Sequence, residues 1–192
     1  MPQTKAQRRF FAFITVFITV HAYVFYSLYV VNGAAIMKQG NSTSVLEAIS
    51  NMGGIYMLGR NVPVWAVILT EFILAFTLEC IMGSPCSFLL ASKVFDITKT
   101  NPVLFETAVI CATVGLMCPA MSFLAAFLYY PYYAGFSIVS LLASFLKLVC
   151  FNFPFAFFTQ LFFIQPFVRT VFKHIVLKFY QNKPDSQKIK FG

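Results

Sequence analysis

Apolar residues dominate four long stretches of the chain, and polar or basic residues separate them. The first stretch, Phe10–Val31, contains no charged residue and follows three basic ones. A secretory signal peptide also places basic residues before an apolar segment, but its apolar core is only about 7–15 residues long. A transmembrane helix needs about 20 residues. We therefore predict that Phe10–Val31 is a first transmembrane helix.

Two further stretches have the length of a single span. The second runs from Val62 to about Met82 and has Pro63 near its start. Proline suits the first helical turn, where its missing N–H would have no partner in any case. The third stretch is Thr107–Tyr130. We predict one transmembrane helix over each.

The fourth apolar stretch, 134–168, is interrupted by Lys147, Asn152 and Pro154. As one straight helix it would be about 50 Å long, which exceeds the bilayer core of about 30 Å. We therefore divide it into a short helix from Ser137 to about Leu146 and a span from about Lys147 to Phe167.

The polar segment between the first two spans predicts a short helix of its own. Ser44-Val45-Leu46-Glu47 matches the capping-box pattern, in which the first and fourth side chains satisfy backbone N–H groups. Gly53-Gly54 would end this helix, because glycine adopts the left-handed conformation readily. We expect a helix from about Ser44 to Met52.

The composition excludes a soluble fold. Residues of the set AVILMFWYC form 59% of the 192-residue chain, and its mean hydropathy is +0.79. Charged residues form 10%, against about 25% in soluble domains. A soluble globular protein, a disordered chain and a coiled coil are therefore excluded. The predicted fold class is an all-α integral membrane protein with four transmembrane helices.

The net charge of +8 sets the expected orientation. In a soluble protein this excess would suggest nucleic acid, but here the positive charges cluster at the two ends of the chain, outside the apolar stretches, and we expect no nucleic-acid partner. Four spans with both termini in the cytoplasm put eleven of the fourteen basic residues on the cytoplasmic side. We predict a multi-pass protein of the plasma membrane, in contact with anionic lipids at its basic cytoplasmic ends. The eleven residues are Lys5, Arg8, Arg9, Lys93, Lys99, Arg169, Lys173, Lys178, Lys183, Lys188 and Lys190.

The five cysteines are interpreted as packing residues, without a role in disulfides or metal binding. They form no CxxC pair, their number is odd, and all lie in or beside apolar stretches, so neither a disulfide framework nor a zinc site is expected. Met117, Cys118 and Met121 are soft ligands that would suit Cu(I). Methionine at helical spacing is more often a packing residue, and we expect no metal or cofactor.

Two halves of the chain match at a displacement of 81 residues. Polar positions correspond, Glu71 with Asn152 and Glu79 with Gln160, and Pro85 corresponds to Pro166. We predict two parallel two-helix repeats, related by an axis along the membrane normal. Residues 1–100 form the first repeat, with the short outer helix in its loop. Residues 101–180 form the second, and 181–192 form a basic cytoplasmic tail.

The residues of the fourth span resemble a known family. The fourth span contains Asn152-Phe153-Pro154-Phe155-Ala156, followed by Gln160-Leu161-Phe162-Phe163-Ile164-Gln165-Pro166. This pattern is similar to that of the bacterial membrane proteins of domain-of-unknown-function family 2798. The opening Met1-Pro2-Gln3-Thr4-Lys5 and the spacing of Glu71-Phe72, Glu79 and Pro85 are similar too. Ser84 and Gln165 stand where the family is expected to have glycine. Members typically carry two repeats, so the resemblance implies an architecture; the family has no established activity.

Glu71 and Glu79 are the strongest candidates for chemistry. A carboxylate at the centre of a membrane helix costs about 2.5–3.5 kcal/mol on insertion scales, so it is a functional candidate by default. The two residues are eight apart, about 80° around a helix, and can share one face. Each also has a structural interpretation. Glu79 could reach the cytoplasmic interface and pair with Arg8, Arg9 or Lys93, and Glu71 could hold two helices together by a hydrogen bond.

Depth in the membrane predicts partners for these carboxyls. Counted at 1.5 Å per residue from the cytoplasmic ends, His21 and Glu71 are nearly level. The repeat would bring Asn152 toward Glu71 and Gln160 toward Glu79. We therefore predict a central ion- or ligand-binding cluster of His21, Glu71, Glu79, Asn152 and Gln160.

Two functions of different classes fit these observations. The first is an oligomeric transporter or channel subunit for a small solute, linked to protons or cations, with a homo-oligomer expected because four spans are few for a transporter. The second is a membrane protein without transport activity that binds a partner protein or lipid. No catalytic or nucleotide-binding motif is present, and we expect no enzymatic activity.

Overall fold

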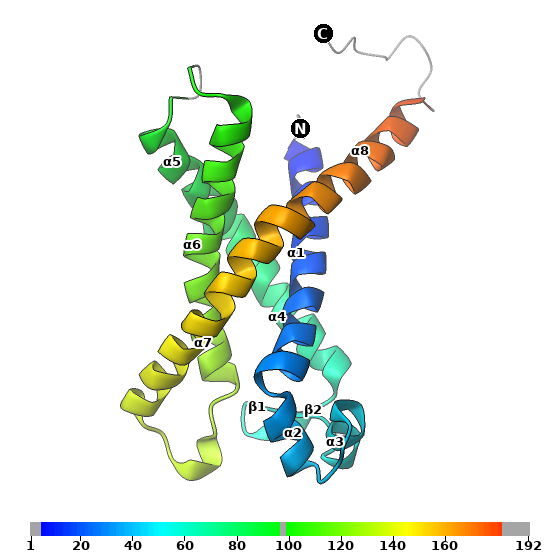
Figure 1. Cartoon of the computed structure of the whole chain (residues 1–192), viewed down its shortest axis with the longest axis vertical. Helices are drawn as coiled ribbons and strands as arrows, with labels where there is room; N and C mark the ends of the chain where they lie inside the picture. Colours follow the sequence, from blue (N-terminus) through cyan, green and yellow to red (C-terminus); the bar gives the residue numbers. More distant parts are fainter. Residues whose placement is uncertain (1–4, 97–98, 182–192) are drawn as a thin grey trace.

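The fold is seen in a computed structural model, which describes residues 5–96 and 99–181. Of the residues that it describes, 83% are helical. Four helices are long and apolar enough to cross a membrane: Gln7–Val31, Val64–Val94, Pro102–Leu128 and Ile138–Ile175. Figure 1 shows them as a bundle in which successive helices run in opposite directions. The number of long apolar helices predicted from the sequence is confirmed.

The first half of the chain contains two long helices and the elements between them. The segments that continue two of the helices as π-helices are labelled η1 and η2. In chain order the elements are α1 (Lys5–Tyr26), η1 (Ser27–Val31), α2 (Gly33–Gln39), α3 (Val45–Asn51), β1 (Ile55–Met57), β2 (Arg60–Val62), α4 (Val64–Leu78), η2 (Glu79–Gly83) and α5 (Ser84–Val94).

The second half contains two more long helices joined by a short connection. Its elements are α6 (Pro102–Leu128), the 3₁₀ turn η3 (Tyr132–Ala134), α7 (Ile138–Phe158), the π-helical η4 (Thr159–Ile164) and α8 (Gln165–Gln181). The side chain of Asn101 accepts a hydrogen bond from the N–H of Val103 and so caps the start of α6.

The predicted division of the fourth stretch near Leu146 is wrong, because α7, η4 and α8 form one continuous helix. Pro154 lies inside it and removes one backbone hydrogen bond. Two tyrosines of α1 contact the carbonyls beside this position: Tyr23 donates to Asn152 O (3.4 Å) and Tyr26 to Phe151 O (3.3 Å). Partners of this kind allow a proline inside an apolar helix. The helix runs obliquely across the bundle (Figure 1).

The second long helix also extends beyond its predicted end near Met82, through Pro85 to Val94. In the second and in the fourth long helix, a π-helical segment ends shortly before a proline. The η2 segment ends two residues before Pro85, and η4 ends two residues before Pro166. A π-helical turn is wider than an α-helical one, which leaves room for the proline ring. The two segments are displaced by about the same 81 residues as the sequence match.

The two ends of the bundle differ in structure. At one end, here called the terminal end, α1 begins, α8 ends and α5 is joined to α6 (Figure 1). At the other, here called the loop end, lie α2, α3, the β1–β2 hairpin and the connection between α6 and α7. The helix α3 was predicted from the sequence, whereas α2 and the two short strands were not.

The predicted capping box is wrong in its partners, although α3 begins after Ser44 as expected. The Ser44 side chain makes no capping hydrogen bond. Ser42 instead links the other two groups of the box: its Oγ donates to the Glu47 carboxyl (2.6 Å) and accepts from the N–H of Ser44 (3.1 Å). The predicted end of the helix is confirmed, because Gly53 and Gly54 have φ angles of 70° and 131°.

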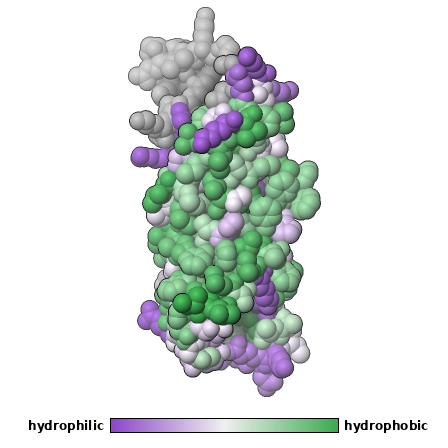
Figure 2. Space-filling view, turned by 90° about the vertical axis from the view of Figure 1, so that its left-hand side faces the viewer, coloured by the Kyte–Doolittle hydropathy of each residue, from purple (hydrophilic) through white to green (hydrophobic). Residues whose placement is uncertain are grey.

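Buried side chains concentrate between neighbouring helices. The largest apolar cluster joins α1 to α4 and to α3, and it includes Val16, Val20, Val24, Ile49 and Ala75. On the outside, many large apolar side chains are exposed along the bundle. The face in Figure 2 is a broad apolar band with polar residues near its two ends. A surface of this kind is what a membrane-spanning bundle requires.

Candidate functional site: a central cavity between the helices

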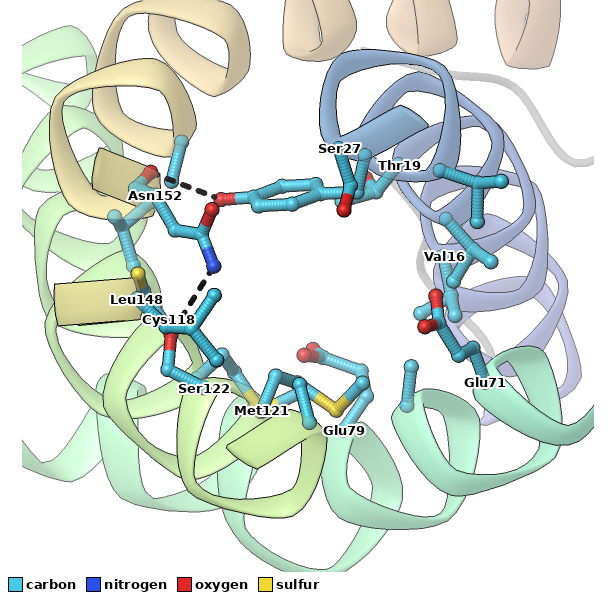
Figure 3. A pocket seen from close by; sticks show the side chains of 18 of the residues that line it. Val16, Thr19, Ser27, Glu71, Glu79, Cys118, Met121, Ser122, Leu148 and Asn152 are labelled. Atoms are coloured by element: carbon cyan, nitrogen blue, oxygen red, sulfur yellow. Dashed lines mark hydrogen bonds between the residues drawn. The ribbon is translucent and has the colours of Figure 1, made fainter. Parts of the chain in front are cut away.

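A large cavity lies between the four long helices. Its volume is about 1770 Å³. It extends from Arg8 and Lys173 at the terminal end to Gln39 and Tyr133 at the loop end. Figure 3 shows it enclosed by helices, with side chains from several of them facing an open centre. Ligand pockets usually measure about 300–1,000 Å³, so the cavity is large enough for a small organic molecule and water.

Glu71 lies in the loop-end half of this cavity. It is on α4, one turn after Val67, which is 2% exposed and packs in a cluster with Met57 and Leu128. That packing fixes the rotation of α4 and turns position 71 toward the interior. The hydroxyl of Tyr129, just after α6, donates a short hydrogen bond to the Glu71 carboxyl. The contact therefore connects the two halves of the chain.

Glu79 lies nearer the terminal end, at the first position of η2. Its carboxyl accepts a hydrogen bond from Ser84 Oγ (2.6 Å), on the following turn. Gly83 leaves space for this carboxyl, because a Cβ at position 83 would overlap the Glu79 carboxyl oxygen. Figure 3 shows the Glu79 carboxyl pointing into the open centre of the cavity.

Neither carboxyl is paired with a basic residue in the part of the chain that the structure describes. The two ion pairs found there are Lys99–Asp96 and Arg169–Glu106. The pairing of Glu79 with Arg8, Arg9 or Lys93, one of the two interpretations open from the sequence, is absent from the described residues. Acidic groups inside membrane proteins normally have a charged or hydrogen-bonding partner. Here the partners are the hydroxyl groups of Tyr129 and Ser84.

Asn152 and Gln160 also line the cavity, on the side formed by the second half of the chain. Asn152 Nδ2 donates to Ser122 Oγ (3.4 Å), and Gln160 Nε2 donates to Thr19 Oγ1 (2.7 Å). The structure brings these amides and the two glutamates into one cavity. The amides bind other helices, however, and make no direct hydrogen bond to the carboxyls.

His21 does not join this group, and its predicted meeting with Glu71 is wrong. Its Nδ1 lies 2.8 Å from the carbonyl oxygen of Phe17, and its ring packs against the Phe17 ring at 4.3 Å. Thr19 and Tyr23, two residues away on either side, face the cavity instead. Depth gives the level of a residue along a helix, but the rotation of the helix decides which face it occupies.

The sequence did not predict the contacts Tyr129–Glu71, Ser84–Glu79, Asn152–Ser122 and Gln160–Thr19, nor one ion pair. At the terminal end of the cavity, Arg169 of α8 and Glu106 of α6 form an ion pair (2.5 Å). From the sequence, Arg169 was one of several basic residues of the C-terminal segment, and Glu106 had no predicted role. The available signal was an acidic residue directly before the third apolar stretch.

The soft ligands that would suit Cu(I) also face the cavity. Met117, Cys118 and Met121 line it from α6. Among the described residues, no group of three or more His, Cys, Asp or Glu side chains is placed to hold a metal ion.

Comparisons with models of protein families, with curated proteins and with solved structures find no match for this chain. The resemblance to domain-of-unknown-function family 2798 therefore rests on the fourth-span residues and on the spacing of Glu71, Glu79 and Pro85.

Proposed function

We propose that the chain is a multi-pass protein of the plasma membrane with both termini in the cytoplasm. Four long apolar helices and an outer surface rich in exposed apolar side chains support insertion in a bilayer. The terminal end, which carries most of the basic residues, then faces the cytoplasm and its anionic lipids. The two π-helical segments before Pro85 and Pro166 support the proposed pair of repeats.

Single-cysteine labelling tests this topology. In a background without the five native cysteines, Thr43→Cys at the loop end should react with a membrane-impermeant maleimide added to intact cells. Lys99→Cys at the terminal end should react only after the membrane is permeabilised. Both positions are exposed, so access to the reagent is the only difference between them. Labelling of Lys99→Cys in intact cells would contradict the topology.

We propose that the protein moves protons or small cationic solutes through the central cavity, as a transporter or a channel subunit. The supporting observation is the position of Glu71 and Glu79 along a cavity that reaches both ends of the bundle, without a basic partner among the described residues. A carboxyl of this kind can exchange a proton or bind a passing cation.

The cavity lies within one chain, so this proposal does not depend on the expected homo-oligomer. Its wall is formed by residues of both halves, including the hydrogen-bonded contacts Tyr129–Glu71 and Gln160–Thr19. A homo-oligomer would then consist of several complete cavities side by side.

A second candidate is a protein that binds a lipid or a partner without transport. Hydrogen bonds between helices favour it, because Glu71, Asn152 and Gln160 each contact another helix or its end and could act only as structural links. Apolar residues such as Val16 and Leu148 also line the cavity and could contact an acyl chain.

Filling the cavity separates the two candidates. Ala125 of α6 lines the cavity, and Ala125→Trp should block flux of protons or monovalent cations in proteoliposomes of the purified chain. Leu69→Trp is the control, because Leu69 is 51% exposed and lies outside the cavity wall. It should leave the flux of the original protein unchanged. Absence of flux in the original protein, or equal flux in both variants, would contradict transport through the cavity.

A further inference from the structure

Three tyrosines line the loop-end part of the cavity, which also contains Glu71; one of them, Tyr133, is 81% exposed. Tyr56 of β1, Tyr129 and Tyr133 all contribute to the wall there. The rings of Tyr56 and Tyr133 are in edge-to-face contact with centroids 5.6 Å apart. Tyr129 packs in the cluster of Met57, Val67 and Leu128, which places it between β1 and α4. These four residues, Glu71, Tyr56, Tyr129 and Tyr133, are here called the tyrosine site.

Tyr56 also differs from two neighbouring tyrosines in its hydrogen bonding. Its hydroxyl oxygen is buried and has no hydrogen-bond partner in the described part of the chain. Buried polar groups almost always have a partner, so this hydroxyl is an exception among the buried polar groups of the described residues. Two other tyrosines of this end have partners: Tyr129 donates to Glu71, and Tyr130 to the backbone of Gly135.

The chemistry of the tyrosine site selects a class of ligand. Glu71 provides one carboxyl, and the tyrosine rings provide negative π faces that attract an organic cation. An inorganic cation such as Ca²⁺ or Mg²⁺ needs about six or more oxygen ligands, and one carboxyl with its hydroxyl partner falls short of that. Apolar side chains beside the rings, Val67 among them, suit apolar substituents on the cation.

Nearby charges are compatible with a cationic ligand. Besides Glu71 and Glu79, the cavity wall includes one charged residue of α7, Lys147. It is exposed, and it forms no ion pair with Glu71 or Glu79 within the described residues. Arg8, Arg169 and Lys173 line the opposite, terminal end. The loop-end half is therefore the part of the cavity where a carboxyl and aromatic rings meet with the least competing positive charge.

We infer that the tyrosine site binds an organic cation with apolar substituents, and that such a cation is the solute the cavity serves. The inference rests on the proposed function, because it names the substrate class of the same cavity. Glu71 binds the charge, the rings of Tyr56, Tyr129 and Tyr133 contact its face, and the apolar wall holds its substituents.

Equilibrium dialysis with the full-length protein in detergent tests this inference. The probe is radiolabelled tetraphenylphosphonium, and tetraphenylborate is the control ligand with nearly the same shape and the opposite charge. Tetraphenylphosphonium should bind saturably, and tetraphenylborate should show only the linear partition of the detergent micelles. Equal saturable binding of both ions, or saturable binding of neither, would overturn the inference.

Four variants place the binding at the tyrosine site. Glu71→Gln should weaken tetraphenylphosphonium binding by about 30-fold or more, because a buried opposite charge is lost. Tyr56→Leu should weaken it by about 2- to 30-fold, whereas Tyr56→Phe keeps the ring and the affinity. Tyr29→Leu is the matched control, because Tyr29 is 45% exposed, packs on Phe25 and lies outside the cavity wall. An affinity unchanged in both Glu71→Gln and Tyr56→Leu would overturn the inference.

The outcome of the binding experiment can be distinguished from the outcome of the flux experiment that tests transport. Proton or cation flux in proteoliposomes without saturable tetraphenylphosphonium binding would overturn the tyrosine site and leave the proposed function standing. Saturable binding that depends on Glu71, in a protein without flux, would support the tyrosine site as a ligand site and contradict transport.

Discussion

Glu71→Gln is expected to reduce proton or cation flux in proteoliposomes to the level of empty liposomes. Glutamine has nearly the shape of glutamate, and its carbonyl can still accept the hydrogen bond from Tyr129. It can neither release a proton nor neutralise a cation. Hydrogen bonds between helices in membranes average about 0.6 kcal/mol, so the melting temperature in detergent should change by about 1–3 °C. Flux and stability should therefore separate.

The control is the same change, glutamate to glutamine, at a position outside the cavity. Glu47→Gln removes an exposed carboxyl of α3 that binds Ser42 and lies outside the cavity wall. It should leave flux unchanged. Glu79→Gln, which retains an acceptor for Ser84, should behave like Glu71→Gln. If flux persists in both cavity variants, the carboxyls act as structural links and the binding function without transport is favoured.

Gly54→Ala adds only one methyl group, but it is expected to destabilise the loop end strongly. Gly54 has a φ of 131°, which L side chains rarely adopt, and a Cβ there would overlap the carbonyl of Val62. Strain of this kind costs about 1–3 kcal/mol before the overlap is counted. We expect a decrease of about 4–12 °C in the melting temperature in detergent.

Gly53→Ala is the matched control for this experiment. Gly53 is the neighbouring residue and has a φ of 70°, but a Cβ there would meet open space. Its cost is the left-handed conformation alone, about 1–2 kcal/mol. The two variants should therefore differ clearly in melting temperature. Equal effects would show that the contact between Gly54 and the β2 strand contributes nothing to the stability of the loop end.

The sequence determined the parts of this protein that depend on local physics. Four long apolar stretches predicted four long helices, because only a helix satisfies its own backbone groups among apolar surroundings. Gly53-Gly54 predicted the end of α3, because glycine adopts the left-handed conformation readily. The inward position of Glu71 followed from the cost of exposing a carboxyl to lipid. These inferences need no knowledge of the neighbouring helices.

Tertiary structure decided everything that depends on a partner. The length of the fourth stretch predicted a division near Leu146, but the helix continues there and also through Pro154, where tyrosines of α1 contact the neighbouring carbonyls. Ser42, which the capping-box pattern does not include, stands between the Glu47 carboxyl and the N–H of Ser44.

The composition of the cavity was decided in the same way. Counting residues predicted a level for His21 but not its face, and it lies against Phe17 and outside the cavity. Tyr129 reaches Glu71 from the other half of the chain. The order of residues along each helix determines which groups lie at each depth. The rotation and crossing of the helices, set by packing between distant segments, decide which of those groups meet.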